Sequence, residues 1–122
     1  MAIKTSSAKA KGRELQKHCR DRILAVFYLQ EGDAASTSMG AQGVDIPLSP
    51  HARKYCPLSI ECKNVKKLDL PGAMRQATAN KYKDTYPVVV HKPYRVGFNE
   101  SLVTLRFEDL LAILEKLNKC RE

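Results

Sequence analysis

Two acidic residues and a lysine occur at a spacing suited to cutting a phosphodiester bond. Asp45 precedes Glu61-Cys62-Lys63, with fifteen residues between the two acids. Hydrolysis at neutral pH needs an activated water and relief of the negative charge that builds on the phosphorus, and divalent metal ions supply both. Because Mg²⁺ prefers carboxylate oxygens, we expect Asp45 and Glu61 to share one Mg²⁺, with Mn²⁺ able to substitute. The backbone carbonyl of Cys62 is the candidate third ligand, and Lys63 would orient the attacking water or contact the phosphate.

The same residues also occur on exposed strand faces, where a Glu and a Lys have no chemical role. Three features of the sequence favour the chemical interpretation. Glu61 and Lys63 belong to the strand-like segment 58–63, Asp45 lies in a second strand-like segment after a Gly-rich loop, and a helix carrying Glu14 precedes both. A period of two directs Glu61 and Lys63 to one face of their strand and its apolar residues to the other.

The elements that must position these residues follow from hydrophobic periodicity. Helices are predicted over residues 12–30, 69–82 and 107–119, and strands over residues 44–48, 58–63, 86–91 and 102–105. In the middle helix, Ala73 and Ala77 stand one turn apart and predict a slim contact face. The order of elements predicts an α/β sandwich around a mixed sheet. Residues 1–11 are expected to form a flexible basic arm and residues 12–122 a single domain.

Composition narrows the class of partner and the compartment. The net charge of +8 on 122 residues favours a polyanion such as nucleic acid. No signal peptide and no apolar span of membrane length is present, so we expect a cytoplasmic protein. The four cysteines form no CxxC pair and are expected to be free thiols. A zinc site using His51, Cys56 and Cys62 is the alternative, but its spacing matches no common zinc pattern.

These residues resemble a known family. Glu14 in an opening helix, a Ser/Gly loop, Gly43-Val44-Asp45-Ile46 and Ile60-Glu61-Cys62-Lys63 together are similar to the PD-(D/E)XK nucleases. Within that superfamily the chain resembles the archaeal-type and phage-encoded Holliday-junction resolvases, over roughly residues 10 to 115. The segments STSMG, DIPLSP, IECKN and PVVVHK are similar to the phage members in particular.

The resemblance implies a restriction-endonuclease-like fold, with a central mixed sheet flanked by helices, and a Mg²⁺-dependent endonuclease that cuts four-way DNA junctions as a homodimer. It implies in-line attack of water that leaves a 5′-phosphate and a 3′-hydroxyl. Asp45 and Glu61 would be the metal-binding acids, Lys63 the catalytic lysine, and Glu14 a helix glutamate beside the metal. The remaining catalytic candidates are a loop serine, Ser36 or Ser38, and a glutamine on the helix after the ExK motif, Gln76.

Two features depart from the simplest form of this family pattern. Pro47 interrupts the strand expected after Asp45, whereas proline belongs at a sheet edge or a bulge. Residues 49–57 also make a longer connection between the two acids than a tight hairpin would need. Both features affect how the strands at 44–48 and 58–63 would pair as a hairpin, which is the arrangement expected to let Asp45 and Glu61 share one ion.

Basic and polar residues around the motif are candidates for phosphate contacts, which set affinity and orientation on DNA. They are Arg13, Ser36, Arg53, Lys54, Lys66, Lys67, Arg75, Lys81 and Lys83. The alternative is a solvated basic surface. Two alternatives also remain for the whole chain: a nuclease of the same fold with another DNA substrate, nicking or restriction-like, and a non-catalytic DNA-binding module.

Overall fold

The computed structural model describes residues 2–36 and 43–121, with side chains from residue 7 onward. Its helices and strands are the following, in chain order: α1 (Ala2–Val26), the 3-10 helix η1 (Glu31–Asp33), α2 (Pro50–Tyr55), β1 (Leu58–Lys63), α3 (Leu70–Asn80), β2 (Tyr86–His91), the 3-10 helix η2 (Phe98–Glu100), β3 (Leu102–Leu105) and α4 (Phe107–Arg121). Among these residues, no helix is long and apolar enough to cross a bilayer.

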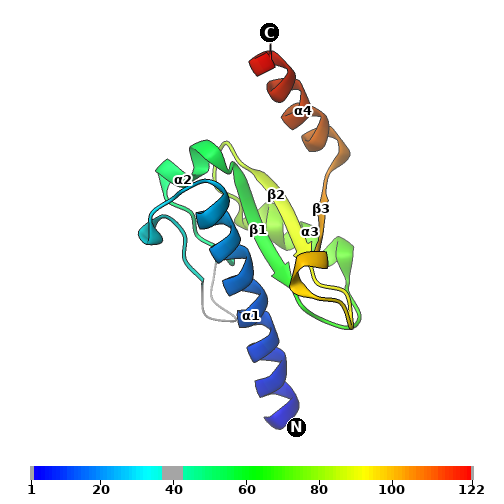
Figure 1. Ribbon diagram of the computed structural model, residues 1–122. Coiled ribbons are helices and arrows are strands. Elements are labelled where there is room, and N and C mark those ends of the chain that lie inside the picture. Colours follow the sequence, from blue (N-terminus) through cyan, green and yellow to red (C-terminus); the bar gives the residue numbers. More distant parts are fainter. Residues whose placement is uncertain (1, 37–42, 122) are drawn as a thin grey trace.

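Within the described residues the strands form one mixed sheet in the order β1-β2-β3 (Figure 1). β1 and β2 are parallel, in a register that runs from Leu58 opposite Tyr86 to Lys63 opposite His91. β3 returns antiparallel to β2, with Leu105 opposite Val88. The chain is therefore mixed α/β with a small mixed sheet, as the sequence predicted. Parallel pairing matters for the site, because it brings the carboxyl ends of β1 and β2 to the same edge of the sheet.

Helices pack on both faces of this sheet, and the alternation along β1 and β2 explains which residues meet them. On one face, Leu15 of α1 belongs to the same buried cluster as Ile60, Cys62 and Val88. On the other face, Ala73 and Ala77 of α3 pack with Val89. Both alanines are buried, which confirms the slim contact face predicted for this helix. A helix with such small side chains lies close to the strands beneath it.

The strands at 58–63, 86–91 and 102–105 coincide with the prediction, whereas the helix boundaries differ. α1 begins at Ala2, well before the predicted start at Gly12, because residues 2–11 are rich in Ala and Lys and carry no helix breaker. It ends at Val26, before Gln30, and Tyr28 then takes a positive φ of 53°. α2 was not predicted. Its signal was present in the sequence as Ser49 and Pro50, because the Ser49 side chain accepts a hydrogen bond from the Ala52 N–H and proline suits the first turn.

The strand predicted over residues 44–48 is wrong. Leu48 makes only an isolated antiparallel bridge to Ala34, and no regular strand forms in the described part of this segment. Pro47 has no N–H to donate to a ladder, and Gly43 before it takes a φ of 95°. The segment is nevertheless well buried, through Val44, Ile46 and Leu48. It therefore packs beside the sheet without becoming a member of it.

Candidate active site

Asp45 is fixed against the outer edge of β1 although it lies in no strand. Its backbone N–H donates to the carbonyl of Ile60 at 3.1 Å. Its carboxylate Oδ2 accepts the N–H of Cys62 at 2.7 Å. The first contact is a backbone hydrogen bond of the kind that joins two paired strands. In the second, the Asp45 side chain accepts the Cys62 N–H in place of the backbone carbonyl that a paired strand would offer. Asp45 therefore lies beside Glu61, as predicted, without the hairpin that the prediction invoked.

The side chains of Ile60 and Cys62 lie on one face of β1. The side chain of Glu61 lies on the other face, which α3 covers. It pairs in register with Val89, which packs against Ala73 and Ala77, and only 2% of its surface is exposed. The sequence predicted that this face carries the chemistry and the other the core. The structure shows that both faces are covered and that the carboxyl group of Glu61 is itself buried.

The carboxyl groups of Glu61 and Asp45 interact directly. Burial, then a hydrogen bond to Asp45 and the negative charge of Asp45, together raise the pKa of Glu61 to about 8, against the opposing charge of Lys63. Two adjacent carboxyls hold a proton more tightly than an isolated one, because both cannot ionise cheaply in a poorly solvated place. Oε2 of Glu61 is buried without a hydrogen-bond partner among the described residues. A cation that displaced the shared proton would satisfy this oxygen, so the donor set fits a hard divalent ion.

The backbone around Glu61 adds a further oxygen on the same side. The N–H and C=O of one strand residue point toward the same neighbour. Because the N–H of Cys62 points to Asp45, its carbonyl also points to this outer edge of β1, where it was predicted to be a ligand. The carbonyl of Lys63 points the other way and accepts the N–H of Lys92 at 3.1 Å.

Lys63 and Gln76 are brought together, as the prediction for both residues requires. Nζ of Lys63 donates to Oε1 of Gln76 at 3.3 Å. Both residues line an open hollow of about 370 Å³ between the end of β1 and the start of α3, which Lys67 and Gly72 also line. The hydrogen bond holds the ammonium group at the carboxyl end of β1, two residues along the chain from the buried Glu61.

Glu14 does not join these acids. It is exposed on α1 and lines a neighbouring hollow of about 340 Å³ with Lys11, Asn64 and Lys92. Val65 borders both hollows. Among the described residues, no three His, Cys, Asp or Glu side chains gather closely enough to hold a metal ion. The structure thus brings together two of the three predicted metal acids.

In the described part of the chain, the four cysteines do not form the zinc site that was the alternative interpretation of Cys56 and Cys62. Cys19, Cys56, Cys62 and Cys120 are all described and are free thiols. Cys56 and Cys62 are buried in the core, whereas His51 is exposed. They belong to no group of three metal-binding side chains within the described residues, so the structure offers no support for zinc there.

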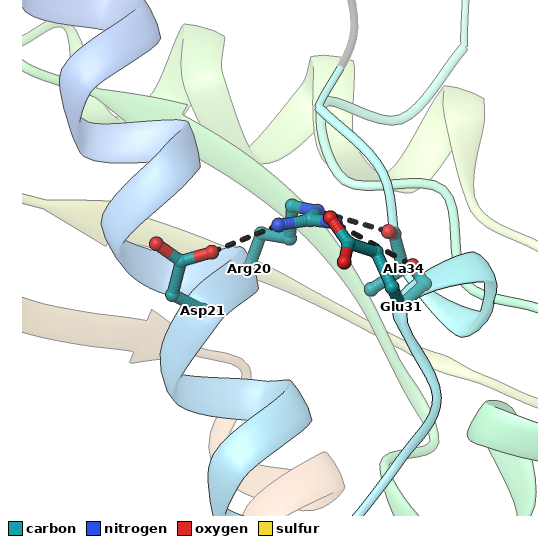
Figure 2. A network of polar contacts seen from close by, with 4 residues as sticks. All are labelled: Arg20, Asp21, Glu31 and Ala34. Atoms are coloured by element: carbon teal, nitrogen blue, oxygen red, sulfur yellow. Dashed lines mark hydrogen bonds and ion pairs between the residues drawn. The ribbon is translucent and has the colours of Figure 1, made fainter.

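The segment that leads toward Asp45 is tied to α1 by polar contacts. Arg20 donates through Nε to the carbonyl of Ala34 at 3.0 Å, and its guanidinium also pairs with Glu31 at 3.0 Å and with Asp21 at 2.9 Å (Figure 2). These contacts fix residues 31–34 against the helix. No motif in the sequence indicates that Arg20 has this role.

Of the two candidate loop serines, only Ser36 lies in the described part of the chain. Its hydroxyl donates to Oε1 of Gln16 at 2.7 Å. Gln16 is only 1% exposed, and a buried glutamine on α1 was not anticipated. Ser38 lies outside the described residues. The contact seen for Ser36 is therefore with the helix, on the same short segment that Arg20 holds.

Parallel pairing separates the predicted DNA-binding cations into two groups. Lys66 and Lys67 follow β1 and lie at the carboxyl edge of the sheet with Lys63. The residues that precede β1 and β2 lie at the opposite, amino edge; these are Arg53, Lys54, Lys81 and Lys83. Arg53 is also engaged internally, with a hydrogen bond to the carbonyl of Leu48 and its guanidinium 4.3 Å from the Tyr82 ring centroid.

The two remaining cations predicted to bind DNA lie on helices. Arg13 is exposed on α1. Arg75 is exposed on α3 and lines an apolar hollow with Met74 and Leu105. They are therefore placed by α1 and α3, and not by the ends of the paired strands.

Three cations at the carboxyl edge were not predicted. Lys11, Lys92 and Arg95 all line the hollow that contains Glu14. Tyr94 stands beside them, 53% exposed, with Nζ of Lys66 4.8 Å from its ring centroid. The signal in the sequence was the run HKPYR directly after the strand 86–91. This run could be placed near Lys63 only by knowing that the strand before it is parallel to β1.

Comparisons with known proteins supply no template for this site. No protein-family model, no curated protein and no solved structure matches the chain. A function is therefore argued from the geometry of Asp45, Glu61 and Lys63 and from the charge around them.

Proposed function

We propose that this chain is a metal-dependent endonuclease that cuts four-way DNA junctions. The observation that carries the proposal is the contact between the carboxyl groups of Asp45 and Glu61, made where β1 approaches its carboxyl end and followed immediately by Lys63. Such a contact is costly in a protein without a counterion, because burial and the neighbouring Asp45 together raise the pKa of Glu61 to about 8. Perturbed acids of this kind are typical of catalytic and metal-binding sites.

The proposed site uses oxygen donors from one side of β1. A bound Mg²⁺ or Mn²⁺ would activate water and neutralise the charge that builds on the phosphate. Asp45, Glu61 and the carbonyl of Cys62 would hold it. Lys63, whose ammonium group is kept in place by Gln76, would contact the phosphate oxygen or orient the attacking water. The exposed Glu14 would act from the neighbouring hollow, where it can reach the DNA or its ions.

Charge supports DNA as the substrate. The chain carries a net charge of +8, and Lys11, Lys66, Lys67 and Lys92 lie around the carboxyl edge next to Lys63. Cations in this position would hold a phosphate backbone across the site. The choice of a four-way junction, the restriction-endonuclease-like fold and the homodimer come from the resemblance to the PD-(D/E)XK resolvases, and they belong to the same proposal. Two copies would present two sites to two symmetric strands.

The test compares cleavage of a four-way junction with cleavage of a linear duplex of the same sequence, in Mg²⁺. The proposal expects the junction to be cut and the duplex to be spared. Asp45→Asn should lower the cleavage rate by about 10²-fold or more, because a metal-binding carboxylate is lost. DNA binding should stay intact, because the basic surface remains. Asp84→Asn is the matched control, since Asp84 is an exposed acid before β2, at the amino edge of the sheet.

Two other outcomes would favour the alternatives. Equal cutting of the junction and the duplex would favour a nuclease of the same type with another substrate. Binding without cleavage in either Mg²⁺ or Mn²⁺ would favour a DNA-binding module and overturn the enzyme proposal.

A further inference from the structure

An apolar stripe on α4 is left uncovered. Phe107, Leu110, Leu111, Leu114 and Leu117 recur at steps of three and four residues, so they share one side of the helix. Their exposed fractions run from 38% for Leu110 to 69% for Phe107. Among the described residues of α4, none is buried. The helix extends away from the layers of the sheet, beyond the amino ends of β1 and β2 (Figure 1).

An apolar groove lies on the α1 side of the sheet. It has a volume of about 650 Å³ and is lined by residues from α1 and from all three strands of this sheet, among them Ile23, Phe27, Leu58, Val90 and Val103. Val103 of β3 remains 55% exposed there. The molecule therefore carries an unpartnered apolar helix and, elsewhere on its surface, an unfilled apolar groove.

The α4 of the same chain cannot fill this groove. β3 ends at Leu105 and α4 begins at Phe107, so Arg106 alone connects them. A helix that folds back over its own strand needs a connection of roughly 2–6 residues. Two contacts also hold α4 in its outward direction: Arg106 pairs with Asp109 at 2.8 Å, and Nζ of Lys116 lies 5.3 Å from the Tyr86 ring centroid. The occupant of the groove must then come from another molecule.

The uncovered area suits a second copy of this chain. The five side chains of the stripe set the size of the contact, since each is between 38% and 69% exposed. Taking on the order of 150–200 Å² for each large apolar side chain, these five residues expose roughly 400 Å² per copy, the size of a monomer's largest apolar patch, which is often a binding surface. Each stripe would cover a comparable area of groove wall, so the two contacts together would bury about 1,600 Å², the size of a standard specific protein interface.

Charge is complementary between the helix and the groove. The first turn of α4 carries two acids, of which Asp109 pairs with Arg106 of the same chain and Glu108 is exposed. The groove is lined on its α1 side by His18 and Arg22. An incoming α4 can therefore place its acidic turn against these residues while its leucines enter the apolar part.

We propose that two copies of this chain exchange their α4 helices, so that the leucine stripe of each fills the α1-side groove of the other. A short connection that holds an element away from its own body favours such an exchange. This inference rests on the proposed function in one respect: it identifies the surface through which the proposed homodimer would form. The hollow lined by Lys63 and Gln76 shares no lining residue with this groove, so it stays open in both copies.

The test measures the mass of the full chain by analytical ultracentrifugation across a concentration series. We expect the wild-type chain at twice its 13.7 kDa. The double variant Leu111→Glu/Leu114→Glu should be a monomer, and Val103→Glu, in the groove, should weaken the dimer at least tenfold. Lys119→Glu is the matched control, because it changes the net charge by the same two units from the other side of α4 and should stay dimeric. Far-UV circular dichroism checks that each variant is folded.

Each of three results would overturn the exchange. The first is a monomeric wild-type chain at micromolar concentration. The second is a double variant in α4 that remains dimeric, and the third is a dimer whose dissociation constant is unchanged by Val103→Glu. The last would mean that α4 pairs outside the groove. Cleavage is measured separately, so a dimer that cuts no DNA would reject the nuclease proposal alone, and a monomer that cuts junctions would reject the exchange alone.

Discussion

Replacing Glu61 with glutamine should stabilise the metal-free protein at neutral pH and remove its response to Mg²⁺. The carboxyl of Glu61 is buried against Asp45, and burial followed by the Asp45 contact raises its pKa from 4.5 to about 8. In the folded protein at pH 7 the group is therefore protonated, whereas in the unfolded chain it is ionised. Glutamine has the same shape as the protonated acid, can donate its amide hydrogens to Asp45, and does not titrate.

The size of the effect follows from linkage between protonation and folding. A group whose pKa is raised on folding contributes stability that is complete below its unfolded pKa, near 4.5, and is lost as the pH rises through its folded pKa, near 8. Each pH unit in this window costs about 1.4 kcal/mol. The wild-type chain should therefore lose about 3 kcal/mol between pH 4.5 and pH 7 from this group, and Glu61→Gln should not.

Urea denaturation in the presence of a chelator measures this difference directly. The free energies of unfolding of the two chains should separate steadily from about pH 4.5 to about pH 8. Adding Mg²⁺ at pH 7 should then stabilise the wild-type chain by mass action and leave Glu61→Gln unchanged. Glu14→Gln, which removes an exposed carboxyl, is the control and should follow the wild type in the pH series. If Glu61→Gln were destabilised at pH 7, or kept the pH dependence of the wild type, the buried carboxyl pair would be refuted.

Three further predictions concern the core, the segment before the site and the DNA surface. Ser59→Ala should cost about 1–3 kcal/mol in urea denaturation, because it leaves Thr85 Oγ1 and the Tyr82 N–H without the buried hydroxyl that contacts them at 2.7 Å and 2.9 Å; Thr78→Ala, at an exposed hydroxyl, should cost less. Arg20→Met should speed hydrogen exchange in residues 31–36, which Arg20 holds through Ala34 and Glu31, and an unchanged exchange rate there would contradict that role. Lys66→Ala/Lys67→Ala should lower the slope of log K against log salt for DNA by roughly 2, whereas Lys54→Ala/Lys83→Ala, at the amino edge, should leave it nearly unchanged; equal effects would mean that the carboxyl edge is not the DNA surface.

Several elements could be predicted from the sequence because their signals are local. The strands at 58–63, 86–91 and 102–105 follow from short apolar and β-branched runs, and Ala73 and Ala77 mark the contact face of α3. Periodicity of this kind depends on neighbouring residues only. The prediction over residues 44–48 was wrong because apolar residues were taken for a strand, when burial alone explains them and Pro47 prevents a ladder.

Asp45, Glu61 and Lys63 were identified from residue type and spacing, but their environment was decided by contacts between distant parts of the chain. The hydrogen bond from the Cys62 N–H fixes Asp45 at the edge of β1 without a hairpin. The close approach of α3 buries Glu61, and this burial changes its acidity. Desolvation depends on what covers a group in three dimensions, so no pattern along the sequence reports it.

The sequence by itself determined which residues could do chemistry and which stretches become strands, since side-chain type and hydrophobic period are properties of adjacent residues. Only the tertiary structure decided that β1 and β2 are parallel, and that decision placed Lys92 beside Lys63 and Lys83 at the other edge. It also left the leucines of α4 without a partner in their own chain. Strand direction and helix packing are set by contacts between residues far apart in the sequence, and such contacts form only when the whole chain has folded.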